Sequence, residues 1–483
     1  MTSPDELSAE ATEHLLLGEA IARLSREIQD VRRDLDDRVE YNARQVRSAR
    51  RAVERMRLDR QLRRIPNAIR QTIKRTIGKR APDGTVGEAR ATPVIPYVSS
   101  SKSTLLTVAH NYPVDESAYG GQPVARRLKY YRDAGHYVAV FVPSRDGTSR
   151  KVTAADGTDV VISGLDSLNE YGRSLGATQL LVHSPTPEVW SHAKHLAELM
   201  PTHVWMHGFE SRSWRELGFD FTAAQMREQS PRLDALDTEK AKVLSTIMAD
   251  PRINTIFVSA FMQSISEDFA GTTAATPHII HNVIDLKAFP YRRRTTADRM
   301  KISVIRSFDK RNYGTDLATL AILELRKKPW FDELAIRVIG DGRHFEEDTE
   351  PLRGLTNVSL EQGFLGPGDL GAVLSQSGVA LLPTRWDSQG MMMGEAMAAG
   401  VVPVTNAVAA IPEFVDADCA MLADTEDYRG LAAGIAELVE SPDRYAALSL
   451  AAHNRVRTQC SAAYTVEREL KLFAEAKTES AKR

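Results

Sequence analysis

Two carboxylates, Asp387 and Glu395, lie close together in a segment that is rich in glycine and methionine. This segment, Asp387 to Gly400, follows an apolar run and is expected to enter a helix near Met391. The N–H groups at the start of such a helix favour an anion, whereas Glu395, one turn in, can accept hydrogen bonds from sugar hydroxyls. The alternative interpretation of the methionines that open the helix is that they belong to the hydrophobic core.

Three further loops follow predicted strands, at the edge where open parallel sheets bind their ligands. Arg306 and Arg311 lie on one loop, and arginine side chains can bind the oxygens of a diphosphate bidentately. His207 ends another strand and precedes a glycine. Gly120 and Gly121 lie between a strand and a helix whose first N–H groups could bind a phosphate. The alternatives are a solvated charged loop, a structural histidine and a glycine pair that only shapes a turn.

Two series of short apolar runs, alternating with amphipathic stretches, must position these loops. Such alternation is typical of a parallel sheet with helices on both faces. The strands are expected at Thr104–His110, Tyr137–Val142, Gln179–His183, Val204–His207 and Thr255–Ser259, then at Ile302–Ile305, Ile336–Ile339, Val358–Leu360, Val379–Leu382 and Val401–Val404. The sequence therefore predicts an α/β protein with two Rossmann-like, doubly wound domains at 104–295 and 296–483, joined near Phe289–Arg299.

The first 80 residues have a different character. Glu19 to Ile65 contains neither glycine nor proline, and its apolar residues step by three and four, which predicts a coiled-coil helix with a stutter after Leu35. Arg60 to Arg80 holds eight Lys or Arg and no acid, and its isoleucines recur every four residues, which predicts a basic amphipathic helix. A linker rich in Gly, Pro and Ser is expected at 81–103. We expect a homo-oligomer through the coiled coil and peripheral contact of the basic helix with an anionic membrane. The alternatives are a single isolated or surface-packed helix, and basic charges that only solvate a helix or bind an acidic face of a partner.

Composition excludes several classes of protein. The formal net charge of −2 argues against a protein that coats nucleic acid, and 42% hydrophobic residues are ordinary for a soluble globular chain. The two cysteines indicate no disulfide framework and favour a reducing compartment. The first residues lack the pattern of a signal peptide, and no apolar run is long enough to span a membrane. A cytoplasmic protein is expected, and Asp416 and Asp418 are not expected to bind a metal.

Taken together, these motifs resemble the retaining glycosyltransferases of family four, which have the GT-B fold. The segment Asp387 to Gly400, with its continuation to Phe414, is similar to their nucleotide-sugar signature, in which two glutamates are separated by seven residues. The other matching motifs are Gly120-Gly121, Ala134–His136, Asn282–Asp285, Ile339–Gly342 and Gly366, so the resemblance extends over about Thr104 to Ala476. The chain departs from the pattern at Asp387, where the family most often has Glu, and at Arg311, where it most often has Lys. Asp-Ser-Gln-Gly at 387–390 is also similar to a subset of bacterial surface-polysaccharide transferases.

The resemblance implies a role for each matching position. Glu395 would bind the ribose of a nucleotide sugar, and the loop at Gly390 would face its phosphate and its sugar. His207 would lie beside the sugar, and Gly121 would approach the phosphate. The expected catalytic residues are thus His207, Asp387, Arg306 and Arg311, and the expected donor-binding residues are Gly120, Gly121, Arg306, Arg311, Gly390, Met391 and Glu395.

The predicted activity is the transfer of a sugar from a UDP- or GDP-linked donor to a glycan or lipid-linked acceptor, with retention of anomeric configuration. The two arginines would stabilise the departing nucleoside diphosphate, so that neither a cofactor nor a metal is expected. Two alternatives stay open: a sugar-nucleotide epimerase of the same architecture, and a non-catalytic oligomeric scaffold.

Overall fold

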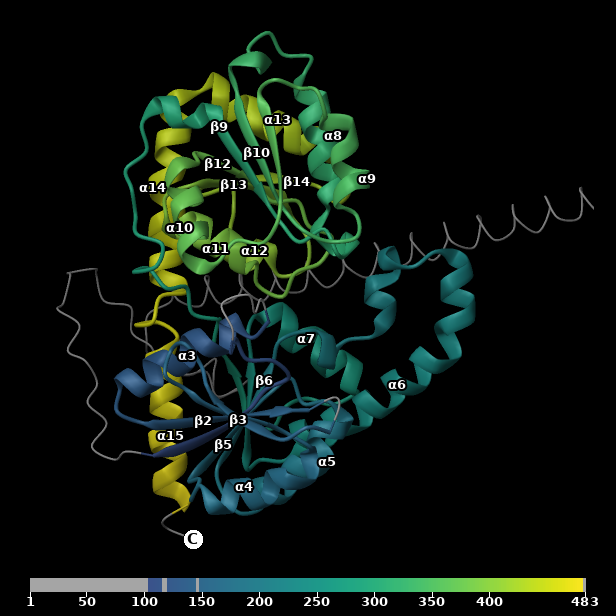
Figure 1. Cartoon of the computed structure of the whole chain (residues 1–483), viewed down its shortest axis with the longest axis vertical. Helices are drawn as coiled ribbons and strands as arrows, with labels where there is room; N and C mark the ends of the chain where they lie inside the picture. The colour runs from purple at the N-terminus through teal and green to yellow at the C-terminus, as the bar shows by residue number, and fades with distance from the viewer. Residues whose placement is uncertain (1–102, 115–119, 145–146, 481–483) are drawn as a thin grey trace, which may run out of the picture.

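The computed structural model describes residues 103–114, 120–144 and 147–480. Within these ranges the chain forms two α/β domains, stacked one above the other in Figure 1. The coiled coil and basic helix predicted for residues 1–80 lie outside the described residues. The two doubly wound domains predicted from the alternating pattern are confirmed.

The first domain is built on an eight-stranded sheet with the order β3-β4-β2-β1-β5-β6-β7-β8. Its strands pair in parallel except for β3, which pairs antiparallel with β4. The bounds are β1 (Thr104–Val108), β2 (Tyr137–Pro143), β3 (Arg150–Thr153), β4 (Asp159–Ser163), β5 (Gln179–His183), β6 (Thr202–Met206), β7 (Ile253–Phe257) and β8 (Pro277–Ile279). The sequence did not indicate β3, β4 or β8. Two of them, β3 and β8, are short edge strands that have no fully buried residue and no apolar run.

The helices of the first domain begin where the sequence offers capping groups. Thr186, Thr222 and Ser259 each accept a hydrogen bond from a backbone N–H in the first turn of the helix that follows. The bounds are α3 (Gln122–Asp133), α4 (Leu168–Ser174), α5 (Pro187–Ala197), α6 (Ala223–Ala249) and α7 (Ala260–Ala270), with 3₁₀ turns η1 (Leu165–Ser167), η2 (Phe209–Ser211) and η3 (Trp214–Asp220).

The second domain has a six-stranded, fully parallel sheet with the order β11-β10-β9-β12-β13-β14. Its strands are β9 (Lys301–Ile305), β10 (Ala335–Gly340), β11 (Val358–Gln362), β12 (Val379–Leu381), β13 (Val402–Asn406) and β14 (Met421–Ala423). Its helices are α8 (Thr315–Leu325), α9 (Phe345–Thr349), α10 (Pro367–Gln376), α11 (Met391–Ala398), α12 (Ile411–Phe414), α13 (Tyr428–Glu440) and α14 (Pro442–Gln459), with 3₁₀ turns η4 (Thr296–Met300), η5 (Arg311–Tyr313), η6 (Phe331–Glu333) and η7 (Glu350–Leu352). Most of α11 is buried, so it can be short and still hold a fixed position.

The arginine-rich stretch at 289–299, expected at the domain junction, is bound to the second domain by its arginines. Arg294 donates to the carbonyl oxygens of Leu374, Ser375 and Ala399, at 2.6–3.0 Å. Arg299 donates to the carbonyl of Val439 at 2.7 Å. These carbonyls lie in the last turns of helices, where intrahelical donors are absent and cations are favoured. The arginines thus fix the entry of the chain into β9.

The end of the chain returns to the first domain, so the predicted range 296–483 does not describe a single unit. In Figure 1, α14 runs along the second domain and α15 (Val466–Ser480) along the first, beside α3. Apolar residues of α15 belong to the core around β1 and β2. Buried Glu469 accepts hydrogen bonds from Arg127 at 3.1 Å, Tyr131 at 2.5 Å and the Trp205 indole at 3.1 Å. This carboxylate had no visible partner in sequence, because all three donors lie more than 260 residues earlier in the chain.

Candidate functional site

A cavity of about 240 Å³ lies between the two domains. It brings His207, after β6 of the first domain, to the same space as Asp387, before α11 of the second. Its lining consists of Ser184, His207, Gly208, Phe209, Arg212, Leu217, Lys310, Asn312, Tyr313, Trp386, Asp387 and Ser388. These residues come from loops at the carboxyl ends of strands and from the 3₁₀ turns beside them, where ligands bind in open parallel sheets.

His207 is held as a neutral imidazole. Its Nε2 lies 2.9 Å from Nδ1 of His183, and burial lowers the pKa of His207 to about 3. The loop that follows is fixed by the buried carboxylate of Glu210, which accepts hydrogen bonds from the N–H groups of His207 and Gly208. A neutral histidine at a cavity wall can exchange hydrogen bonds with a hydroxyl group without bringing a charge.

Asp387 is oriented by the backbone of its own loop. Its Oδ1 accepts hydrogen bonds from the N–H groups of Gln389 at 3.1 Å and Gly390 at 2.7 Å. Its carbonyl accepts a third hydrogen bond, from the Ala410 N–H at 3.2 Å. Although Asp is shorter than the Glu usual in similar sequences, the loop presents this carboxylate at the cavity wall.

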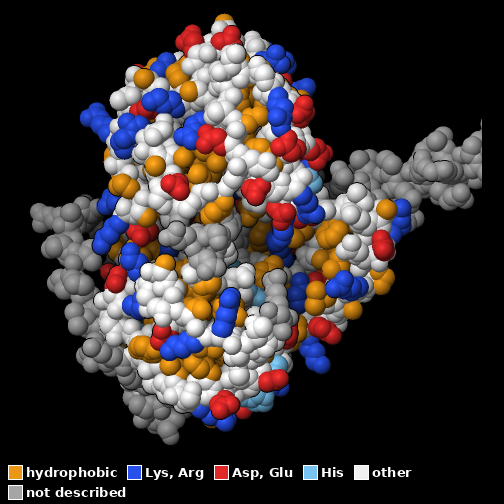
Figure 2. Space-filling model, in the orientation of Figure 1, with side chains coloured by type: hydrophobic (Ala, Val, Ile, Leu, Met, Phe, Trp, Pro, Cys, Tyr) orange, Lys and Arg blue, Asp and Glu red, His pale blue; other side chains and the backbone are white. Residues whose placement is uncertain are grey.

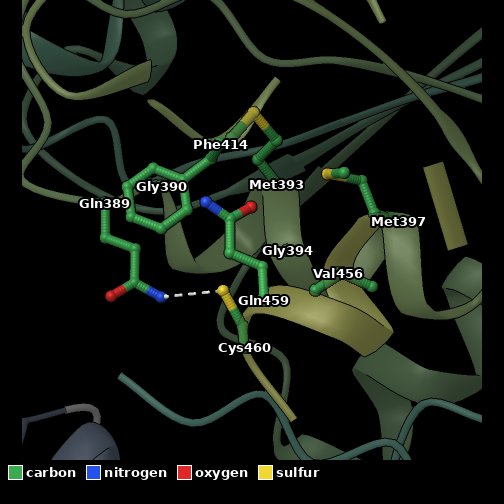
Figure 3. A pocket seen from close by; sticks show the side chains of 9 residues that line it. All are labelled: Gln389, Gly390, Met393, Gly394, Met397, Phe414, Val456, Gln459 and Cys460. Atoms are coloured by element: carbon green, nitrogen blue, oxygen red, sulfur yellow. Dashed lines mark hydrogen bonds between the residues drawn. The ribbon is translucent and has the colours of Figure 1, made fainter. Parts of the chain in front are cut away.

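Gln389 of the same loop contacts Cys460 beside a small pocket, as Figure 3 shows. The amide of Gln389 accepts from the Asn282 N–H at 2.6 Å, donates to the Asn282 carbonyl at 2.9 Å, and lies 3.7 Å from the sulfur of Cys460. Met393 is fully buried beside a small pocket there, and Met391 is partly buried against the same core. Packing therefore accounts for Met393, and a donor contact of Met391 stays a prediction.

Glu395 lies one turn into α11 and contacts the first domain through an arginine that the sequence interpretation missed. Nη1 of Arg126, in α3, donates to its Oε1. Burial raises the pKa of Glu395, and the positive charge of Arg126 lowers it. The two side chains are separated by 269 positions and no motif includes Arg126, so only the fold could reveal the pair.

Arg306 lies at the carboxyl edge of the second sheet. Its Nη2 donates to the carbonyls of Leu382 at 3.0 Å and Pro383 at 3.3 Å. Its guanidinium lies 5.4 Å from the ring centre of Tyr313, which lines the cavity. Arg306, which is predicted to bind the diphosphate, thus lies close to the cavity. Its side chain is held by the carbonyl groups of the loop that leads to Asp387.

The other predicted arginine, Arg311, is engaged in ion pairs on α9. Its Nη1 lies 2.5 Å from Asp348 and its Nη2 lies 2.9 Å from Glu347. The neighbouring Lys310 lines the cavity instead. A contact of Arg311 with a diphosphate would require these pairs to break, whereas Lys310 already faces the required space.

The loop from Arg306 to Arg311 depends on the glycines of the motif at 339–342. A Cβ on Gly340 would lie 1.9 Å from the carbonyl oxygen of Arg306. Gly342 has φ +139°, and a Cβ there would lie 2.3 Å from the backbone nitrogen of Asp309. These glycines therefore let the cation-bearing loop lie directly on β10 and the turn after it.

Gly121, the second glycine of the predicted phosphate-binding pair, starts α3. It has φ +84°, and a Cβ would lie 2.4 Å from the Asn111 carbonyl oxygen. Gly120 lies against the side chain of the same asparagine. Close backbone approach is sufficient reason for glycine here, and contact of either glycine with a phosphate stays a prediction.

One contact between the domains closes the cavity beside Asp387. The Arg212 guanidinium lies 3.6 Å from the ring centre of Trp386, a cation–π contact between the domains. Together with Lys310, Arg212 gives the lining two cations that sequence reasoning did not select. The cavity residues that the sequence did not single out are Ser184, Phe209, Arg212, Leu217, Lys310, Asn312, Tyr313 and Trp386. Each lies in a loop or a short 3₁₀ turn. Gly208 and Ser388 lay within motifs that the sequence did show.

Charges of both signs are interspersed over the face of the two domains seen in Figure 2. Across residues 103–114, 120–144 and 147–480, no three His, Cys, Asp or Glu side chains are grouped so that they could hold a metal ion. Asp416 is paired with Arg455 at 2.7 Å. In the same ranges, no helix combines the length and the apolar character that crossing a membrane requires.

Residues 299–441, which include the cation-bearing loop, Asp387 and α11, match the family described as Glycosyl transferases group 1. The MMP alpha-(1->4)-mannosyltransferase of Mycolicibacterium hassiacum is 27% identical over 186 residues, which are 38% of this chain and 44% of that protein. The match thus spans less than half the length of this curated relative.

Solved structures resemble the chain over both domains. Sucrose-phosphate synthase from Thermosynechococcus elongatus has a TM-score of 0.60 at 15% identity, covering 77% of this chain and 99% of that one. Anabaena Alr3699/HepE, solved in complex with UDP and glucose, has a TM-score of 0.55 at 14% identity, covering 77% of this chain and 100% of that one. The chain therefore carries a group 1 glycosyltransferase domain within the two-domain GT-B fold.

Proposed function

We propose that this protein transfers a sugar from a UDP- or GDP-linked donor to a glycan or lipid-linked acceptor, with retention of anomeric configuration. One observation carries the proposal: the segment that matches group 1 glycosyltransferases forms the second-domain wall of the cavity that faces His207. A cavity with few, convergent polar groups between two domains is a usual place for a small-molecule site.

In this proposal the donor lies across the interface. Its ribose hydroxyls donate to Glu395, and its diphosphate lies beside Gly390 and Met391 at the start of α11, where the helix dipole favours negative charge. Arg306 and Lys310 approach the diphosphate from the neighbouring loop. The sugar then extends into the cavity, beside His207 and Asp387.

The chemistry requires that the bond between the anomeric carbon and the diphosphate oxygen breaks while the oxygen of the acceptor hydroxyl bonds to that carbon and the hydroxyl proton passes to the departing diphosphate. Negative charge develops on the departing diphosphate, and preorganised cations stabilise it. We assign that role to Arg306 and Lys310, with Arg311 holding the loop through its ion pair with Asp348. Neutral His207 and oriented Asp387 would position sugar hydroxyls. We propose that these side chains suffice without a metal.

A donor screen with product analysis tests the function. UDP-sugars come first because the HepE complex contains UDP and glucose, and GDP-mannose follows because the curated relative is a mannosyltransferase. Release of nucleoside diphosphate, a product glycoside with the donor's anomeric configuration by NMR, and activity that persists in excess chelator are the expected results.

Other results would replace the proposal. An epimerised nucleotide sugar without transfer would indicate an epimerase. Turnover abolished by chelator and restored by Mg²⁺ or Mn²⁺ would contradict the metal-free mechanism. If no nucleotide sugar binds or reacts, the protein is not a transferase of this kind and a scaffold role becomes the better account.

Residues 1–80, outside the described part of the chain, carry a separate proposal. We propose a cytoplasmic homo-oligomer that is held at an anionic membrane surface by the basic segment, close to lipid-linked acceptors. The full chain should be oligomeric by light scattering, whereas a chain that begins at Ser99 should have a smaller oligomeric state. Only the full chain should sediment with anionic vesicles at low salt. Identical behaviour of the two chains would exclude both roles.

A further inference from the structure

Two successive arginines of helix α3 contact different domains. Arg127 points into the first domain, where Glu469 accepts from its Nε at 3.1 Å and Asn282 from its Nη2 at 3.2 Å. Arg126 points to the second domain and pairs with Glu395. Successive residues of an α-helix are separated by about 100° around its axis. Arg127 is fully buried and hydrogen-bonded, so it helps to fix the rotation of the helix about its axis and with it the direction of Arg126.

The contact of Arg126 with Glu395 uses only one oxygen of the carboxylate. Nη1 of Arg126 donates to Oε1, and among the described residues no side chain or N–H group donates to Oε2. A carboxylate has about four acceptor sites, so it can hold a guanidinium and accept from a ligand together. The Arg126 guanidinium also lies over the ring of Phe289, 5.6 Å from the ring centre.

We infer that Arg126 is a positioning residue for the nucleotide: it holds Glu395 through Oε1, so that Oε2 is aimed at the ribose hydroxyls of the donor. This inference rests on the proposed function and adds a first-domain residue to the nucleotide site. Because Arg126 and Glu395 lie on different domains, the ribose acceptor is in place only when the domains are together. Nucleotide binding and domain closure are then coupled through one ion pair.

The physical reason for such a partner is the burial of Glu395. An ionised carboxylate in a buried position requires a compensating charge or donors, and without them it takes up a proton. A protonated Glu395 would lose acceptor strength toward hydroxyls. Burial raises the pKa of Glu395, and the positive charge of Arg126 acts against that rise while one carboxylate oxygen is left for the ligand.

The test measures the affinities of UDP and uridine, and in parallel of GDP and guanosine, for the full chain and its variants. Arg126→Ala should weaken the nucleoside and the diphosphate by the same factor, about tenfold, because the lost contribution concerns the ribose. Arg126→Lys should recover most of the affinity. Arg132→Ala is the matched control, since Arg132 lies on the same helix and pairs with Asp156 at 3.2 Å. It should bind as the unaltered chain does.

A double-mutant cycle separates the inference from the proposed function. In a Glu395→Gln background, Arg126→Ala should cause little further loss, because Arg126 acts through Glu395. A loss confined to the diphosphates, or losses that multiply in the double variant, would show direct phosphate contact and overturn the inference alone. The inference alone is also overturned if the Arg126→Ala variant binds the nucleotides as tightly as the Arg132→Ala variant does. If Glu395→Gln binds nucleotides as the unaltered chain does, the ribose assignment itself fails. Thermal unfolding of each variant identifies any that is not folded.

Discussion

The two domains build their halves of the site in different ways. The second domain supplies one continuous segment, from Trp386 to Glu395, in which Asp387 is oriented by N–H groups two and three residues away. The first domain supplies separate residues, among them Arg126 from α3, His207 after β6 and Arg212 after η2. A continuous segment carries its geometry in local hydrogen bonds, whereas dispersed residues meet only when the whole fold is formed. Binding of the nucleotide is therefore expected to depend mainly on residues of the second domain. The closed arrangement of the domains is expected to depend on contacts between them.

The largest expected effect of a substitution distinguishes Lys310 from the neighbouring Arg311, both in the second domain. Lys310→Ala should lower kcat/KM by about 100- to 1,000-fold, the usual consequence of removing one electrostatic contact to a developing charge. Arg311→Ala is the matched comparison. It leaves buried Asp348 without its ion-pair partner, so it should mainly lower the free energy of unfolding, by about 2 kcal/mol. Steady-state kinetics and urea unfolding of both variants measure this. A larger kinetic loss in Arg311→Ala would return the diphosphate role to Arg311.

A smaller effect is expected on the ribose side of the same domain. Glu395→Ala removes hydrogen bonds to a charged acceptor, worth roughly 1.5–3 kcal/mol, and should weaken nucleoside diphosphate binding about 10- to 100-fold. Calorimetric titration measures the affinity, and the far-UV circular dichroism of the variant should be unchanged. Binding equal to that of the unaltered chain would show that the second-domain segment does not carry the ribose.

The smallest effect concerns the interface itself. Glu413, on α12, accepts from the N–H groups of Ala260 at 2.8 Å and of Phe261, at the start of α7 in the first domain. Burial raises the pKa of Glu413 to about 7 from its ordinary 4.5. Between these values the folded chain binds a proton that the unfolded chain does not, so stability falls as the pH rises through this window.

Glu413→Gln removes the ionisation and keeps an acceptor. The variant should therefore exceed the unaltered chain in unfolding free energy at pH 8, by about 1–3 kcal/mol, and nearly equal it at pH 4.5, where Glu413 is largely protonated. Urea unfolding at the two pH values decides the matter. A less stable variant at pH 8 would mean that the start of α7 stabilises the charge by more than burial costs.

The sequence could predict features that lie in continuous segments, but not features that depend on residues distant in the chain. Alternating apolar runs predicted most strands of both sheets, because buried parallel strands carry continuous apolar sequence. They did not predict β3, β4, β8 or β14, and of these β3 and β8 carry no apolar run. The return of α15 to the first domain could not be predicted, because the residues that donate to its buried Glu469 are remote in sequence. In the site, the segment at 387–395 was visible as a motif, and His207 and Asp387 line the same cavity. The pairings of Glu395 with Arg126 and of Arg311 with Asp348 were not visible, because ion pairs between distant residues leave no spacing pattern.

The central claim is that a nucleotide sugar lies across the interface, held by the second domain and covered by the first. A structure of the full chain with the nucleoside diphosphate that the donor screen selects tests it most directly. The claim predicts the ribose within hydrogen-bonding distance of Glu395, the diphosphate between the start of α11 and the side chains of Arg306 and Lys310, and the cavity beside His207 left for the sugar. A nucleotide bound elsewhere, or bound with its ribose away from Glu395, would contradict it.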